Sequence, residues 1–222
     1  MIAPTDNQAL GTPYNVGYPI YQPPVQTPPE PLWASAAPLG FAAFAMITLM
    51  LWLTFWGVLP KENGPIVFAM CLAGGIAQIV SGIIELRRGV GVRGNLLATM
   101  GCLFMLAPGF SILLASLKLG VPVPILGYLN MMLGMFMGIW GLAFLRAPKF
   151  VFLISPLGFV ILFSIGFAEI GYHEFKPLAA WTCFMAMVWG LYMLAHALGE
   201  LVHIHLWVGK PLMPMKTPPP GH

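Results

Sequence analysis

Six apolar segments, each about the length of a membrane-crossing helix, leave this chain few ways to fold. A helix needs roughly 20 mainly apolar residues to cross a bilayer. The segments lie at about 37–58, 65–86, 95–117, 124–145, 149–170 and 177–206. Only 8% of the residues are charged, whereas a soluble domain carries about 25%. The sequence therefore predicts an all-α membrane protein with a six-helix transmembrane domain over residues 34–208.

Proline-rich stretches flank this domain on both sides. Residues 1–33 combine many prolines with Tyr, Gln and Asn, and they contain neither Lys nor Arg. Proline fixes φ and removes a backbone donor, which favours extended or disordered chain. We expect residues 1–33 to be a disordered cytoplasmic tail, with a proline-rich docking peptide as the alternative. Residues 209–222 are predicted to form a second proline-rich tail.

The distribution of basic residues predicts the orientation in the membrane. With six spans, both tails share one side with the second and fourth loops. That side holds most of the ten Lys and Arg residues. They are Arg87, Arg88, Arg93, Arg146, Lys149, Lys210 and Lys216. Because basic residues favour the cytoplasmic side, we expect a cell-membrane protein with both termini in the cytoplasm.

The sequence contains none of the common catalytic or metal-binding motifs. It has no GxSxG, no HExxH and no phosphate-binding loop. The 5 histidines and 15 methionines raise a copper or haem hypothesis, but they do not cluster as ligands, and methionine commonly fills apolar interiors. The 3 cysteines lie in different segments without disulfide or zinc spacing. We expect no enzyme activity, no cofactor, no metal and, at a net charge of +3, no nucleic-acid partner.

The second segment carries polar groups and glycines in register. Gln78 and Glu85 are two helical turns apart, and Gly75 and Gly82 keep the same spacing, so each pair shares one helix face. A buried amide or carboxylate needs a partner, while glycines let another backbone approach closely. The pattern favours either a pore lining or a polar helix–helix contact. Arg88 beside Glu85 adds an interfacial salt bridge as a further interpretation.

The fourth and fifth segments carry signals of helix packing. Gly134 and Gly138 form a GxxxG pattern, which predicts a close helix contact. Asn130 is predicted to line a pore or to link two helices. Pro156 predicts a kink or a first helical turn near the start of the fifth segment.

Two stretches carry more specific signatures. The first opens the first span and reads Ser35-Ala36-Ala37-Pro38-Leu39-Gly40-Phe41, followed by Phe44. The second, in and just beyond the second span, combines Gly74, Gly75, Gln78, Gly82, Glu85, Gly89, Gly94 and Asn95. Both resemble signatures of the acetate uptake transporter family, which includes the bacterial succinate–acetate permeases of the YaaH type. Weaker matches extend the resemblance over about residues 35–200.

The resemblance implies an architecture and a function. The implied architecture is a protomer of six helices around a narrow pore, assembled with its copies into a ring-shaped hexamer. The implied function is a transporter or channel for acetate and related small monocarboxylates, with succinate as a further permeant and with protons as a coupled ion in some members.

The resemblance also implies which residues form the site. It places an aromatic–aromatic–aliphatic constriction at Phe44, Ala73 and either Phe159 or Leu162. The signature motif comprises Pro38, Leu39, Gly40, Gly74, Gly75 and Gly82. The polar members of the predicted site are Gln78, Glu85 and Asn95. Among these, the amides are expected to line the pore or fix helices, and the carboxylate to be structural or gating.

Some positions depart from the family pattern. Ser35 and Ala36 replace an asparagine and a proline, and Ala73 replaces the tyrosine before the glycine pair. A carboxylate expected late in the sixth span is Ala197, although Glu200 follows one turn later. Because a carboxylate permeant needs donors in place of water, two alternatives stay open. They are a pore for another small solute, such as ammonia or urea, and a non-transporting structural subunit of a membrane complex.

Overall fold

The computed structural model describes residues 33–119 and 123–213, so the predictions for the two tails fall almost wholly outside it. Within these ranges, six helices are long and apolar enough to cross a membrane, which confirms the predicted number of spans. The first, second and fourth spans are α1 (Ala37–Phe55), α2 (Gly64–Arg87) and α5 (Val123–Phe144). The third comprises α3 (Gly91–Thr99), η2 (Met100–Leu106) and α4 (Ala107–Ser116). The fifth comprises α6 (Lys149–Phe152) and α7 (Ile154–Glu169), and the sixth is α8 (Lys176–Leu201).

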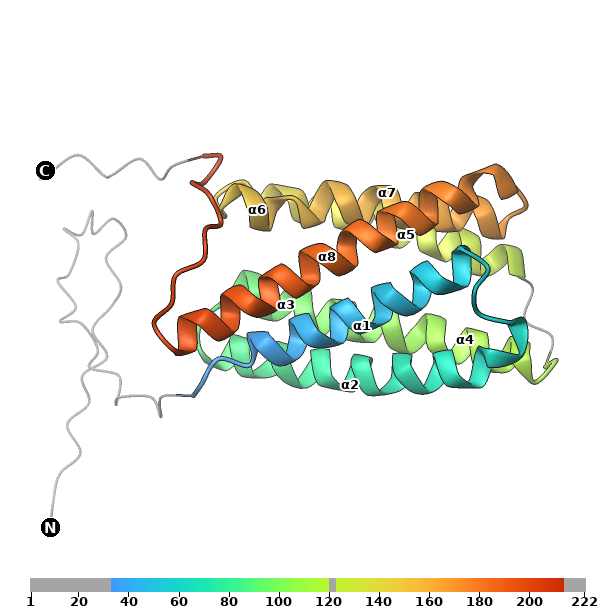
Figure 1. Cartoon of the computed structure of the whole chain (residues 1–222), viewed down its shortest axis with the longest axis horizontal. Helices are drawn as coiled ribbons and strands as arrows, with labels where there is room; N and C mark the ends of the chain where they lie inside the picture. The colour runs from blue at the N-terminus through green and yellow to red at the C-terminus, as the bar shows by residue number, and fades with distance from the viewer. Residues whose placement is uncertain (1–32, 120–122, 214–222) are drawn as a thin grey trace, which may run out of the picture. The chain divides into compact units, whose positions relative to one another are not determined.

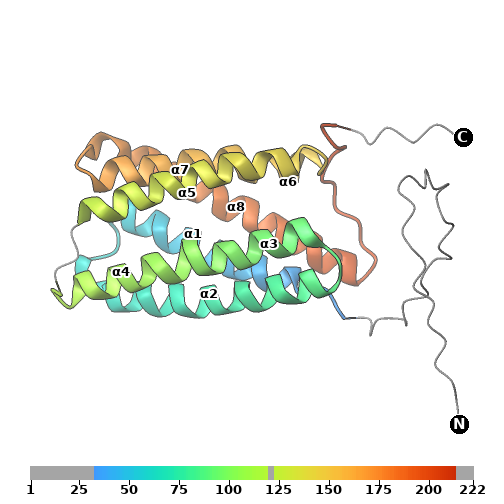
Figure 2. The ribbon, with the colours of Figure 1, turned by 180° about the vertical axis from the view of Figure 1, so that it is seen from behind.

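The spans of residues 33–213 pack as two groups of three. In one group α2 lies between α1 and the third span, and in the other α7 lies between α5 and α8. The most extensive contact between the groups joins α1 to α8, which run side by side at the front of Figure 1. Seen from behind, the third span faces α5 (Figure 2). The start of α1 and the end of α8 lie at the same end, as an even number of spans requires.

Glycine pairs bring α2 against the third span. A Cβ added to Gly82 would lie 2.7 Å from the carbonyl oxygen of Gly94, and one added to Gly75 would lie 3.0 Å from that of Gly101. At both glycines the backbone of the third span lies close to that of α2, as small residues allow in membrane helices. This confirms the predicted role of Gly75 and Gly82 as a close-approach face.

The contact between α5 and α7 uses the predicted GxxxG and a polar link. Gly134 lies against the ring of Phe163, which a Cβ would approach to 2.7 Å. Asn130 Nδ2 donates to Glu169 Oε2 at 2.7 Å. Asn130 therefore links two helices, one of the two roles predicted for it.

Prolines shape the third and fifth spans. The seven-residue η2 has π-helical geometry and ends two residues before Pro108. Proline lacks an N–H and its ring clashes with the carbonyl four residues earlier, so a wider turn before it relieves strain. The fifth span is interrupted at Leu153, and Pro156 lies in the first turn of α7, in agreement with the prediction.

The sixth span is shorter than predicted at its end. We expected it to continue to residue 206, but α8 ends at Leu201. Ile204 N–H donates to the carbonyl of Gly199 at 2.8 Å, and His203 has a φ of 61°. This is the geometry of a Schellman motif, whose left-handed position usually holds glycine. Because histidine occupies that position here, no glycine marks the end of the helix in the sequence.

After α8, residues 202–213 run back along the connection between α5 and α6. Phe150 N–H donates to the carbonyl of Val208 at 3.1 Å, and Lys149 N–H donates to that of Lys210 at 3.2 Å. The described part of the predicted C-terminal tail therefore contacts the helical domain.

Candidate functional site

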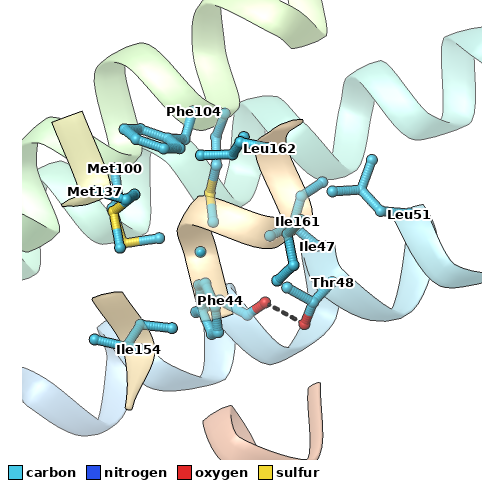
Figure 3. Close-up of a pocket in the computed structure, with 12 residues that line it drawn as sticks. Phe44, Ile47, Thr48, Leu51, Met100, Phe104, Met137, Ile154, Ile161 and Leu162 are labelled. Carbon is cyan, nitrogen blue, oxygen red and sulfur yellow. Dashed lines mark hydrogen bonds between the residues drawn. The ribbon is translucent and has the colours of Figure 1, made fainter. Parts of the chain in front are cut away.

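A cavity of about 60 Å³, called here the central cavity, lies where the two groups of helices meet (Figure 3). The first, third, fourth and fifth spans supply its lining, and none of the lining residues belongs to α2 or α8. Its lining residues are Phe44, Ile47, Thr48, Leu51, Met100, Phe104, Met105, Met137, Ile154, Gly158, Ile161 and Leu162. The volume exceeds the roughly 10–15 Å³ that one water molecule needs. The central cavity is therefore large enough for a very small solute.

The lining of the central cavity is almost entirely apolar. Thr48 carries its one hydroxyl group, which lies 2.9 Å from the carbonyl oxygen of Phe44 and 3.0 Å from that of Ala45. The hydroxyl donor is thus already used within α1, as is usual for threonine in a helix. A charged solute in this space would find little to replace its hydration.

A larger cavity of about 430 Å³, called here the vestibule, lies between α3, the α5–α6 connection and α8. Its wall includes the charged or titratable side chains of Arg93, Arg146, His196 and Glu200. Ile154 lines both the vestibule and the central cavity, so one side chain lies on the boundary between them. Within the described ranges, no three His, Cys, Asp or Glu side chains are placed to hold a metal ion.

The polar face of α2 binds the start of α1. Gln78, Ser81 and Glu85 are all completely buried. Gln78 Nε2 donates to the carbonyl of Gly40 at 3.2 Å, and Ser81 Oγ donates to that of Ala36 at 2.5 Å. Among the described residues, the Oε1 atom of Gln78 has no hydrogen-bond partner. Of the two roles predicted for Gln78, these contacts favour fixing a helix.

Glu85 joins three elements through its carboxylate. Its Oε1 accepts from Ser35 Oγ at 2.8 Å and from the backbone N–H of Ala36 at 3.0 Å. Arg88 donates to Oε1 at 2.9 Å, and Arg93 donates to Oε2 through Nε at 2.9 Å and Nη2 at 2.6 Å. Charge-assisted bonds of this kind are strong. The buried carboxylate therefore ties the start of α1 to the end of α2 and to α3.

The structure brings some of the predicted constriction residues together and separates others. Phe44 and Leu162 both line the central cavity. Ala73 is exposed on α2, and Phe159 is 39% exposed on α7, with neither among the lining residues. Asn95 is exposed, and its Nδ2 donates to the carbonyl of Gly91 at 2.9 Å. The roles predicted for these five residues toward a permeant stay predictions.

The signature glycines hold helices close together. A Cβ on Gly40 would meet Leu97 at 2.8 Å, and one on Gly74 would meet Met105 Sδ at 3.3 Å. Pro38 lies in the first turn of α1, and the neighbouring Leu39 is exposed. The motif thus acts through packing around α1 and α2.

Sequence reasoning missed most of the central cavity. Its methionines, isoleucines and Phe104 look like ordinary apolar residues of a span. It also missed Trp189, which is 5% exposed and lines the vestibule. The available signal was its position halfway along α8, because tryptophan in membrane helices is typical of the interfaces.

Comparison with known proteins supports the fold. No family model and no curated protein sequence matched the chain. Among solved structures, the bacterial acetate channel SatP matches with a TM-score of 0.72 and 24% sequence identity. The match covers 79% of this chain and 99% of that one. The chain therefore has the same fold as SatP, which confirms the six-helix protomer that the resemblance to the acetate uptake transporter family predicted.

Proposed function

We propose that this protein carries small monocarboxylic acids, acetate among them, across a membrane through the central cavity of each protomer. Two observations support this. The fold is that of the SatP acetate channel, and Phe44 and Leu162, two residues expected at the constriction, both line the central cavity. The second observation carries the proposal, because it concerns this chain's own residues.

The vestibule offers basic groups to an anion. Arg93 and Arg146 lie in its wall together with one acidic residue, Glu200, and Arg93 is already paired with Glu85. Arg146 is therefore the basic side chain of the wall that we expect to attract a carboxylate. In this proposal a carboxylate enters from the vestibule and moves toward Ile154 and the central cavity.

Desolvation decides in which form the acid crosses the central cavity. Moving an isolated carboxylate into an apolar space costs tens of kcal/mol, whereas an uncharged polar group costs about 2–7 kcal/mol. The single hydroxyl of Thr48 is engaged with α1. The undissociated acid is therefore the favoured species there, and a proton accompanies each acid molecule. Succinate, with two carboxyl groups, would cross less readily for the same reason.

The assembly and orientation follow from the resemblance and from the charge count. We place the protomer in a ring-shaped hexamer with one narrow pore in each copy, in a cell membrane with both termini in the cytoplasm. The seven basic residues on the side of the termini support this orientation. Crosslinking of the purified protein in lipid would give the copy number, and labelling of cysteines placed in the loops would give the sidedness.

A pore for a small uncharged solute, such as ammonia or urea, is the second candidate. The apolar lining of the central cavity favours it, because such a solute carries no charge to desolvate. Fluxes of acetate, urea and ammonia into the same proteoliposomes separate the two. Saturable or channel-like acetate flux with no urea or ammonia flux supports the monocarboxylate proposal, and the reverse result refutes it.

A further inference from the structure

Trp189 stands between the vestibule and the central cavity. Its side chain lines the vestibule, and its ring lies edge-on to Phe44, which lines the central cavity. The ring centroids of Trp189 and Phe44 are 5.7 Å apart with an interplanar angle of 85°. Phe41 makes the same kind of contact from one turn earlier on α1, at 5.8 Å and 78°. One indole therefore holds two aromatic rings at the boundary between the two cavities.

A hydrogen bond fixes the indole in this position. Trp189 Nε1 donates to the carbonyl of Phe150 at 2.7 Å. Phe150 belongs to α6, next to the interruption at Leu153 and four residues before Ile154. A buried indole N–H needs a partner, and here the partner lies on the segment that leads to the shared side chain of Ile154. The bond therefore joins α8 to the interrupted fifth span across the same boundary.

We propose that Trp189 is the specificity-determining residue that closes the passage between the vestibule and the central cavity to all but the shortest acids. The inference rests on the proposed function, and it adds a residue of α8 to a constriction otherwise expected from the first, second and fifth spans. Trp189 acts by position: its ring fills the space beside Phe44, and its N–H bond keeps the ring from turning aside.

A small side chain at this position would leave that space open. The vestibule of about 430 Å³ would then extend to the central cavity of about 60 Å³ beside Phe44. The flux of longer acids would increase more than the flux of acetate, because acetate already fits the narrow passage. A pocket discriminates by about 10–200-fold for one methylene. We therefore expect the ratio of butyrate flux to acetate flux to rise about tenfold in Trp189→Ala.

The experiment compares W189A, W189F and the unmutated protein in proteoliposomes, with labelled acetate and labelled butyrate. W189F keeps an apolar ring but loses the donor to Phe150, so a rise of about twofold to threefold is expected, smaller than in W189A. W181A is the matched control. Trp181 also lies on α8 and packs edge-on against Trp56, with ring centroids 5.3 Å apart, but it is 54% exposed and lines neither cavity. Its flux ratio should equal that of the unmutated protein.

The flux ratio separates this role from a purely structural one. Partial unfolding lowers both fluxes together and leaves the ratio unchanged. An unchanged ratio in folded W189A overturns the inference, as does an equal rise in W181A. If W189A does not elute as folded protein in gel filtration, the ratio of butyrate flux to acetate flux in W189F decides instead, and an unchanged ratio there overturns the inference. Absence of any carboxylate flux through the unmutated protein would instead refute the proposed function.

Discussion

Replacing Glu85 with glutamine tests whether this buried carboxylate is structural or gates permeation. The amide oxygen of E85Q can still accept from Ser35 and from the Ala36 N–H. Its NH₂ group, however, faces the guanidinium of Arg93, which is also a donor. The substitution therefore removes the negative charge that pairs with Arg88 and Arg93. It also leaves the new amide donor facing the guanidinium donor of Arg93.

The expected loss of stability follows from the burial of the two partners. Removing one member of a buried ion pair costs about 3–5 kcal/mol. Glu85 is fully buried, but the side chains of Arg88 and Arg93 are 28% and 31% exposed, so water screens the charges left behind. We therefore expect E85Q to lower the free energy of unfolding by about 2–3 kcal/mol, and Tm by roughly 5–10 °C.

Unfolding in mixed micelles, followed by circular dichroism, measures this loss. Arg146→Gln is the matched control, since Arg146 is an exposed arginine of the vestibule wall that does not contact Glu85. The double variant E85Q/R93Q should recover part of the loss, with a coupling energy of about 1–2 kcal/mol between the two positions.

Flux through the same variant completes the test. If Glu85 is structural, acetate flux per folded E85Q protomer should stay within about twofold of the unmutated value, well under the tenfold that 1.4 kcal/mol represents. Full stability combined with loss of flux would refute the structural role and assign Glu85 to gating.

Three further substitutions test the site, the first two of them against a control. L162A should widen the central cavity and raise the flux of propionate relative to acetate, and it should lower the free energy of unfolding by about 2–4 kcal/mol. F159A, on the exposed side of α7, is its control and should leave the flux ratio unchanged. G82A should cost about 1–3 kcal/mol in unfolding measurements, because its Cβ would lie 2.5 Å from the backbone nitrogen of Ala98, while G91A, with open space around it, should be nearly neutral. A73Y should leave acetate selectivity unchanged, because position 73 is exposed and lines neither cavity.

Each of these expectations has a clear contrary result. A change of flux ratio in F159A but not in L162A would place the constriction on the other side of α7. Equal stability of G82A and G91A would show that α2 and α3 are not in backbone contact. A gain of acetate selectivity in A73Y would show that position 73 faces the permeant in the assembled protein.

The number and location of the spans were predictable because hydrophobicity and length are strong signals in membrane chains. The role of Gly75 and Gly82 was predictable for a similar reason, since regular spacing fixes a helix face. The end of α8 was not, because His203 takes a backbone conformation that usually belongs to glycine.

The site was harder to predict because burial and pairing are properties of the folded chain. Gln78 and Glu85 were recognised as costly to bury, yet the sequence left open a pore lining and a helix contact. Only the fold shows that both bind the start of α1. Phe44 and Leu162 were named from the resemblance, while Trp189 carried a signal only in its position along the span.

The most direct test of the account is uptake of labelled acetate by liposomes containing the purified protein, with and without an imposed inward proton gradient. We expect uptake that propionate reduces and that the proton gradient accelerates, because the undissociated acid crosses the apolar central cavity. Folded protein that gives no uptake above empty liposomes, under either condition, would contradict it.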